Sequence, residues 1–339
     1  MSMPTDVPAA EAAANAVEMT YRDAVHAALD DSLSADPSVV FMGEDVGNEG
    51  GVYKTNVGLA EKYGERIINT PICENGFTGV ALGMAVMGMR PIVEFMFADF
   101  MPTAGDAIVN QLPKYRFMSG GQLSAPVTLR VVSGAGTRFG TQHTASGESW
   151  YMAQPGMRVA AAGTPAAAYE LLRAAVLSDD PTIVHEHRLL YLRKGMVRPG
   201  AVAEIGKASV EREGTDVTIV ASMLMVQRSL QAAEMLAANE GISAEVIDLR
   251  WIRPLDLDTI SASVEKTGRL LVVEEQPHEG GWGATLISRL TMAGTSMAAR
   301  PSSVSLPQDM LVPFAAPLED AVIPSGERIA DGVRASLLS

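Results

Sequence analysis

Apolar runs alternate with helical patterns along most of the chain, and this alternation predicts an α/β fold. In the first half, we expect strands at 39–43, 91–97, 126–132, 158–163 and 182–187, and helices at 20–36, 74–89 and 165–177. Strands separated by helices of this length favour a parallel sheet that is covered by helices on both faces.

The same alternation returns in the second half, after a polar stretch with Pro and Gly at 193–201. Strands are expected at 215–222, 242–250, 269–275 and 303–307, and helices at 225–239, from about Pro254, after Gly283 and at 325–338. The pattern therefore predicts two doubly wound α/β domains, with a linker between them. We place an N-terminal flexible arm at 1–18, the first domain at 19–192, the linker at 193–206 and the second domain at 207–339.

Composition and charge narrow the possible functions. The 339 residues are 47% apolar and 19% charged, which is typical of a globular protein. The net charge is −14. Because phosphate backbones bind clustered Lys and Arg, this negative charge argues against nucleic acid as a partner. It is compatible with a basic protein partner.

The compartment is predicted from cysteine usage and from the N-terminal segment. Cys73 is the only cysteine, so no intrachain disulfide can form, and no His/Cys cluster suggests zinc. Residues 1–18 contain no Lys or Arg, which secretory and mitochondrial signals need. No apolar run is long enough for a membrane span. We expect a cytoplasmic protein without membrane attachment.

The segment 67–100 carries the first candidate for chemistry, the carboxylate of Glu74. This residue stands at a loop–helix junction, and Gly79 and Gly83 follow on one face of the expected helix. Glycines cost about 1 kcal/mol each in a helix interior, so the pair suggests that a backbone or a ligand approaches closely. The Glu74 carboxylate could simply interact favourably with the dipole at the helix N-terminus, or it could bind a protonated ring nitrogen of a cofactor.

Three further residues could belong to a site, and each also has a structural explanation. His143 lies in a Gly/Ser/Thr-rich loop at 133–146, where it could transfer a proton or could be satisfied by loop carbonyls. Phe100 closes the segment EFMFADF and could be a core aromatic side chain. Glu44 follows the strand at 39–43 and could act in acid–base chemistry or lie in a solvated turn.

Five segments together carry a resemblance to one known family. They are GEDVGNEGGVYK (43–54), residues 67–100, MSGGQ (118–122), TQHTAS (141–146) and AEVIDLRWIRPLD (244–256). Over about 19–335, the chain closely resembles the β subunit of the thiamine-diphosphate-dependent decarboxylating component of 2-oxo acid dehydrogenase complexes. The resemblance implies a pyrimidine-binding transketolase-like domain followed by a transketolase C-terminal-like domain.

The resemblance also implies a role for each candidate residue. Glu74 is expected to bind the aminopyrimidine ring of thiamine diphosphate and to favour its reactive tautomer. Phe100 is expected to stack on that ring, and Glu44 to support Glu74. His143 matches a histidine that acts when the acyl group passes to the lipoyl arm. Many family members have Ser-Gln after this histidine, whereas this chain has Thr144 and Ala145.

Ions and partners are implied in the same way. A potassium ion would be held mainly by backbone oxygens of matching positions: Val127, Ala175, Val176, Ser178 and Asp180. The magnesium and diphosphate motif of the family, Gly-Asp-Gly followed by Asn, does not occur in this chain. The resemblance places magnesium on a separate α subunit. The cofactor would then be shared between subunits of an α2β2 heterotetramer, and this chain alone would be inactive.

The implied activity is that of a lipoamide-acylating 2-oxo acid dehydrogenase. A 2-oxo acid would be decarboxylated oxidatively, and its acyl group passed to the lipoyl domain of a dihydrolipoyl acyltransferase core. The EFMFADF and MSGGQ segments favour pyruvate or acetoin types over branched-chain types. Pyruvate is the expected substrate. An acetoin dehydrogenase β subunit and a non-catalytic scaffold of the same fold are the alternatives.

Overall fold

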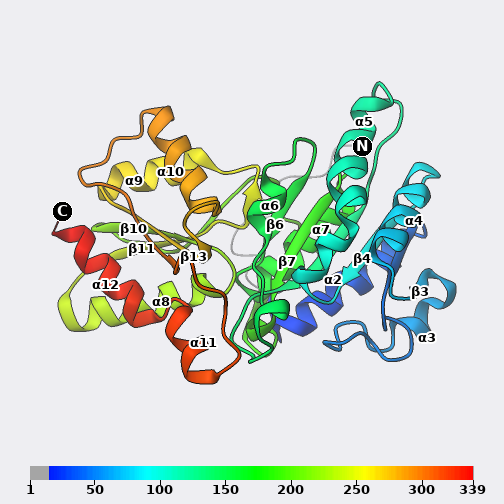
Figure 1. Cartoon of the computed structure of the whole chain (residues 1–339), viewed down its shortest axis with the longest axis horizontal. Coiled ribbons are helices and arrows are strands. Elements are labelled where there is room, and N and C mark those ends of the chain that lie inside the picture. Colours follow the sequence, from blue (N-terminus) through cyan, green and yellow to red (C-terminus); the bar gives the residue numbers. More distant parts are fainter. Residues whose placement is uncertain (1–14, 339) are drawn as a thin grey trace.

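The computed structural model describes residues 15–338 and contains two α/β domains side by side (Figure 1). Within these residues, the first domain is built on a seven-stranded sheet in the order β12-β6-β7-β5-β4-β2-β3. Every neighbouring pair in it is parallel except β12 with β6. The strands are β2 (Val39–Gly43), β3 (Ile67–Asn69), β4 (Arg90–Phe95), β5 (Thr128–Ser133), β6 (Arg158–Ala161), β7 (Thr182–His187) and β12 (Trp251–Arg253).

The second domain has a smaller sheet. Among the described residues it has five strands in the order β14-β13-β10-β11-β9, and only β9 runs antiparallel to its neighbour. The strands are β9 (Ser209–Arg212), β10 (Val217–Ala221), β11 (Ala244–Asp248), β13 (Leu270–Pro277) and β14 (Ser302–Leu306). The predicted two-domain α/β architecture is confirmed.

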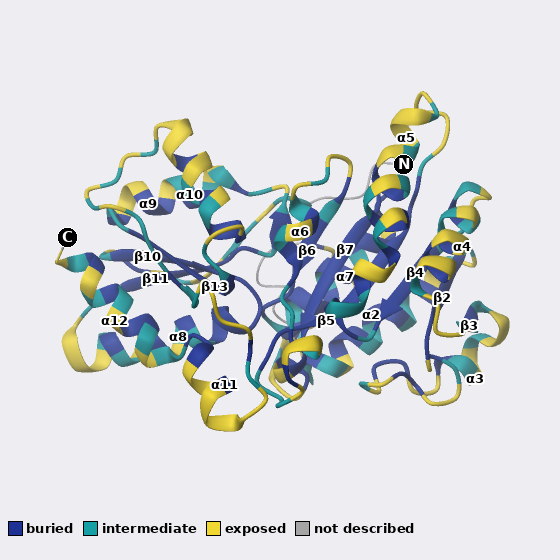
Figure 2. Cartoon of the chain, viewed as in Figure 1, coloured by how far each residue is buried: buried dark blue, intermediate teal, exposed yellow. Residues whose placement is uncertain are grey.

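Helices cover both sheets, and Figure 2 shows buried strands beneath helices with exposed outer faces. One apolar core contains residues of α2 (Tyr21–Ala35), α7 (Pro165–Leu177), α8 (Leu224–Glu240) and α12 (Gly326–Leu337). The other core contains residues of α4 (Glu74–Val86), α9 (Leu257–Thr267) and α10 (Trp282–Ala293). Each core includes residues of both domains, so burial of apolar surface holds the domains together.

The remaining elements are short. They are α3 (Leu59–Tyr63), α5 (Tyr115–Met118), α6 (Glu148–Met152), α11 (Ala316–Val322), η1 (Gly64–Arg66), η2 (Ala98–Ala104), η3 (Asp106–Gln111), η4 (Leu112–Lys114), η5 (Thr141–His143) and η6 (Arg188–Leu190). None of the helices within residues 15–338 combines the length and the apolar character that crossing a bilayer requires.

The predicted arm and linker each contribute a strand. β1 (Val17–Thr20) pairs antiparallel with β8 (Lys194–Val197), so Val17 and Glu18 lie in a strand and not in an arm. The rest of the predicted arm, 1–14, lies outside the described residues. Runs this short show no clear period, and their hydrogen bonds come from a distant partner, so the sequence pattern did not reveal them.

Side-chain caps explain where two helices begin. Thr20 precedes α2, and its Oγ1 accepts a hydrogen bond from the backbone N–H of Asp23 at 3.1 Å. The helix expected from about Pro254 begins only at Leu257, because Asp256 is its cap and accepts from Thr259 N at 3.2 Å. Pro254 lies in the turn that precedes this cap.

Candidate active site

The topology brings the four predicted site residues to one edge of the first sheet. Four neighbouring parallel strands lie in the order β5-β4-β2-β3. His143 follows β5, Phe100 follows β4, Glu44 follows β2 and Glu74 follows β3. Because the carboxyl ends of parallel strands meet at the same edge, their loops form a common ligand-binding edge.

Two carboxyl groups form one end of this edge. Glu74 is the first residue of α4 and is half-buried, and Glu44 is buried. Burial raises the pKa of Glu44 from its ordinary value, and the negative charges of Glu74 and Asp45 raise it further. Within residues 15–338, no donor lies at hydrogen-bond distance from either carboxyl group of this pair. The pair therefore presents carboxyl oxygens that no described group occupies and that a cationic or protonated ligand group can approach.

The glycine face of α4 is open. Gly79 and Gly83 are exposed, and a Cβ atom built on either would meet no atom within 4 Å. Val80 of the same helix is 54% exposed, and Met87, directly after the helix, is 83% exposed. The close approach that the glycines predicted is therefore not made within the described part of this chain.

An aromatic group forms the other end of the edge. The His143 ring lies 4.8 Å from the Phe97 ring and 5.4 Å from the Phe100 ring, between centroids, and both contacts are edge-on. Phe97 and Phe100 are themselves 5.2 Å apart. The contact between His143 and Phe100, which the chain order alone does not show, places the two predicted residues in one group. Phe97 was assigned only to a strand in the sequence analysis.

The two residues after His143 fix its loop. Thr144 is buried, and its hydroxyl donates to the Gly140 carbonyl at 3.0 Å. The Ala145 N–H donates to the Asp99 carboxylate at 3.1 Å, which joins the loop to η2. In this chain, the hydroxyl of Thr144 therefore closes the turn, and the backbone of Ala145 makes the next contact.

A cavity of about 420 Å³ lies beside the His143 loop at the seam between the domains. The first domain contributes Asp99, Thr144 and Trp150, and the second contributes Gln276 and Met310. Pockets of this size accept small molecules or chain segments.

Two buried carboxyl groups near this seam have raised pKa values. Burial raises the pKa of Glu274 from 4.5 to about 8 and that of Glu148 from 4.5 to about 7. Glu274 Oε2 accepts from the Gly283 N–H at 3.1 Å, at the start of α10. Both carboxyl groups are therefore protonated over part of the neutral range.

This gives a prediction for stability against pH. In the unfolded chain, both carboxyl groups lose their protons near pH 4.5. In the folded chain, Glu148 keeps its proton to about pH 7 and Glu274 to about pH 8. The free energy of unfolding should therefore fall as pH rises through this range, by up to about 1.4 kcal/mol per pH unit for each carboxyl group. Urea unfolding of Glu274→Gln, which mimics the protonated form, should show a weaker fall. Exposed Glu265→Gln is the control. Equal slopes for wild type and Glu274→Gln would contradict the prediction.

A buried ion cluster lies among the strands of the first sheet. Arg130 of β5 is 0% exposed and pairs with Glu94 of β4 and Glu186 of β7. Its Nε–Oε1 distance to Glu186 is 2.5 Å. This cluster was not among the predicted sites, although opposite charges inside three apolar strand segments could have indicated it.

The five predicted potassium positions lie near one another, but their carbonyl groups already have donors. Arg90 donates from Nε to Val176 O at 2.8 Å and from Nη2 to Ser178 O at 2.7 Å. The carbonyls of Val127, Ala175 and Asp180 accept from Thr182 N, Ser178 N and Ser178 Oγ. A potassium ion bound by this set would share the Val176 and Ser178 carbonyls with the Arg90 guanidinium, and the ion stays a prediction.

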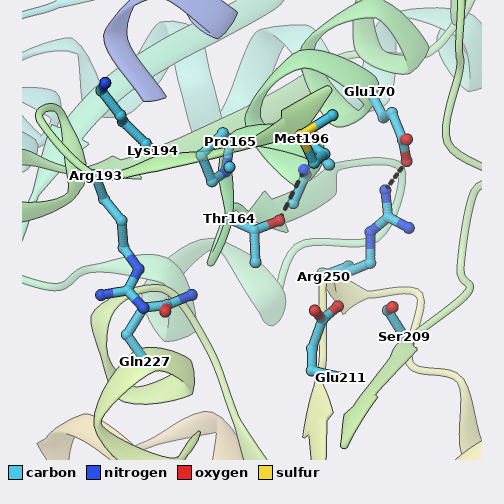
Figure 3. A pocket seen from close by; sticks show the side chains of 13 residues that line it. Thr164, Pro165, Glu170, Arg193, Lys194, Met196, Ser209, Glu211, Gln227 and Arg250 are labelled. Carbon is cyan, nitrogen blue, oxygen red and sulfur yellow. Dashed lines mark hydrogen bonds and ion pairs between the residues drawn. The ribbon is translucent and has the colours of Figure 1, made fainter. Parts of the chain in front are cut away.

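A second cavity, of about 400 Å³, lies between the N-terminus of α7 and the second domain (Figure 3). Arg250 of the second domain pairs with Glu170 of α7 at 2.6 Å. Gln227 of α8 donates to the Gly163 carbonyl at 2.8 Å. These contacts join the two domains and lie outside the predicted site.

The chain matches two protein-family models. Residues 17–194 match "Transketolase, pyrimidine binding domain", and residues 206–329 match "Transketolase, C-terminal domain". The chain is also similar in fold to a solved structure titled "Split gene transketolase, inactive beta4 tetramer". The TM-score is 0.79 and the sequence identity 24%, over 94% of this chain and 99% of the other.

Curated relatives are similar over nearly the whole chain. It is 45% identical to "Pyruvate dehydrogenase E1 component subunit beta-1, mitochondrial" of Arabidopsis thaliana, over 96% of this chain and 90% of the relative. The corresponding beta-2 subunit of Oryza sativa subsp. japonica is 43% identical, over 98% and 90%. "Acetoin:2,6-dichlorophenolindophenol oxidoreductase subunit beta" of Cupriavidus necator is 39% identical, over 94% and 98%. The chain therefore belongs to the family of transketolase-like β subunits that includes those of pyruvate dehydrogenase E1 and acetoin dehydrogenase.

Proposed function

We propose that the chain is the β subunit of a heterotetrameric pyruvate dehydrogenase first component and supplies half of its active site. The observation that carries the proposal is the pair of Glu74 and Glu44 carboxyl groups, which lack donors within the described residues, at the edge that also holds Phe100 and His143. The family implies thiamine diphosphate, which, when bound, supplies a carbon nucleophile and an electron sink for decarboxylation.

Each site residue has a part in this proposal. The Glu74 carboxylate accepts a hydrogen bond from a protonated ring nitrogen, and its negative charge favours that protonation. Glu44 adds negative potential next to it. Phe100 offers an aromatic face, and His143 donates or accepts a proton when the acyl group leaves for the lipoyl arm. Contacts with Phe97 and Phe100 hold the His143 ring in position.

An α subunit completes the site in the proposed α2β2 assembly. Within residues 15–338, no group of three or more His, Cys, Asp and Glu side chains is placed to hold a metal ion, and the chain lacks the family's magnesium motif. As the resemblance implies, we assign magnesium and the diphosphate to the α subunit. The exposed glycine face of α4 suits close packing of a partner's backbone. The dihydrolipoyl acyltransferase core and its lipoyl domain are the proposed acceptors. No step depends on potassium.

One alternative substrate has its own support. The similarity to the acetoin oxidoreductase subunit covers 98% of that relative, so acetoin is the second candidate. A non-catalytic scaffold is less well supported, because no described donor of this chain satisfies the Glu74 and Glu44 carboxyl groups. The cytoplasmic location stays a prediction, since the plant relatives carry the word "mitochondrial" in their names.

The test is turnover by the assembled enzyme. The chain should co-purify with its α partner, and lipoyl-dependent turnover should be fastest with pyruvate, slower with acetoin and slowest with branched 2-oxo acids. The chain without the partner should give no turnover. If acetoin were turned over faster than pyruvate, the chain would instead be assigned as an acetoin dehydrogenase β subunit. Turnover by the chain alone would contradict an active site shared with an α subunit.

A further inference from the structure

Arg188 is a buried cation that the proposed mechanism does not use. It begins η6, directly after β7, so it lies at the same edge of the sheet as His143 and Phe100. The residue is only 5% exposed. No ion pair within residues 15–338 includes its guanidinium. Burying a charge without an ion-pair partner costs free energy of folding, so other contacts should stabilise the Arg188 cation.

The hydrogen bonds of Arg188 are also incomplete. Nη1 donates to Thr137 Oγ1 at a long 3.4 Å, while Nε and Nη2 are buried without a partner among the described residues. Burial lowers the pKa of Arg188 from its ordinary value, and the neighbouring Tyr53, Asp99 and Glu275 oppose this shift. A guanidinium nevertheless stays protonated at neutral pH.

Aromatic rings take the place of a carboxylate around this cation. The guanidinium carbon lies 5.0 Å from the Phe97 centroid and 5.4 Å from the Phe139 centroid, and the two rings are 5.9 Å apart. Cations at this distance from a ring are attracted by its negative face. Phe97 is also the ring that contacts His143 at 4.8 Å and Phe100 at 5.2 Å. Phe97 thus contacts both Arg188 and the two predicted site residues, His143 and Phe100.

We infer that Arg188 is a positioning residue that holds Phe97 and Phe139 by cation–π contacts and thereby fixes His143 for acyl transfer. The inference rests on the proposed role of His143. It explains why two rings lie within cation–π distance of the guanidinium, whereas the Asp99 and Glu275 carboxylates act on its charge without forming an ion pair. It also assigns a function to Phe97 and Phe139, which the sequence analysis did not single out.

The test compares Arg188→Met in two backgrounds, using the enzyme assembled with its α partner. Misplacement of a catalytic group costs up to about a hundredfold in rate, and we expect Arg188→Met to lower kcat for lipoyl-dependent turnover about tenfold. KM for pyruvate should not change, since Arg188 is proposed to act through Phe97 and not on the substrate. Arg188→Lys keeps a cation and should recover most of the loss. In a His143→Gln background, Arg188→Met should cost less than about twofold more, because the group it positions is gone.

Controls separate this role from general stability. Arg173 also stacks on an aromatic ring, that of Tyr169 at 5.4 Å, but on α7 and away from the site, so Arg173→Met should leave kcat unchanged. If Arg188→Met fails to assemble, Phe139→Leu replaces it, because Phe139 is 48% exposed and tolerates change. Phe139→Leu should show the same dependence on His143.

Three outcomes would overturn the inference. Equal losses from Arg188→Met in both backgrounds would make its role merely structural, while leaving the proposed function intact. A raised KM with unchanged kcat would mean that Arg188 binds substrate. Unchanged lipoyl-dependent turnover in His143→Gln alone would overturn both this inference and the proposed role of His143.

Discussion

Replacing Glu74 by Ala should abolish turnover of the assembled enzyme while leaving its fold and subunit composition intact. Glu74 is half-buried at the first position of α4, and no described donor satisfies its carboxylate. The site therefore loses the negative charge that favours the reactive tautomer of the cofactor. In oxyanion holes, removal of one electrostatic contact lowers kcat about a hundredfold or more. We expect Glu74→Ala to lower kcat by at least this factor. Steady-state turnover and the mass of the assembly are the measurements.

A second glutamate distinguishes this role from a helix-end effect. Glu327 lies in the first turn of α12 and is exposed, so Glu327→Ala removes only a favourable interaction with the helix N-terminus. That interaction is worth about 0.3–1 kcal/mol of stability. If Glu74→Ala behaved like Glu327→Ala, with a small loss of stability and near-normal turnover, the simple helix-dipole explanation would be right and the cofactor role wrong.

The regular elements were predictable because their patterns are local. The buried strand at 39–43 and the helix at 165–177 have the same bounds in the structure as in the prediction. A continuous apolar run, and a helix with Thr164 as its cap and Pro165 at its first position, are signals within a few residues. Pairings between distant segments were not predictable in this way. β12 joins the first sheet although its sequence belongs to the second domain, and its three residues have no measurable period.

The site was predictable only in part, for a similar reason. Parallel strands imply that the loops carrying Glu44, Glu74, Phe100 and His143 meet at one edge, and their order along it follows from the topology. Their chemical roles came from the resemblance to a family and stay predictions. The sequence could not reveal that Phe97 connects Arg188 with His143, because this contact depends on side-chain geometry between three loops.

Of the variants proposed for this chain, Arg130→Met should cause the largest loss in the free energy of unfolding. Arg130 is fully buried between Glu94 and Glu186, so its removal leaves two buried carboxyl groups without their cation. Breaking a buried ion pair from one side costs about 3–5 kcal/mol, whereas an exposed pair contributes at most about 1 kcal/mol. Lys62→Met is the matched control, because Lys62 is 55% exposed and pairs with Asp30 at 2.6 Å. Urea unfolding of both variants measures the difference.

The pH dependence of the Arg130→Met loss tests its cause. Burial raises the pKa of Glu94 from its ordinary value, and Arg130 opposes that shift. Without Arg130 the folded chain should hold a proton on Glu94 to higher pH, so the stability of the variant should fall more steeply as pH rises above the ordinary value of 4.5. Adding Glu94→Gln to Arg130→Met removes one uncompensated charge and should recover part of the stability at neutral pH. If the double variant were no more stable than Arg130→Met at neutral pH, lost packing of the arginine stem would explain the effect better than an unpaired buried charge.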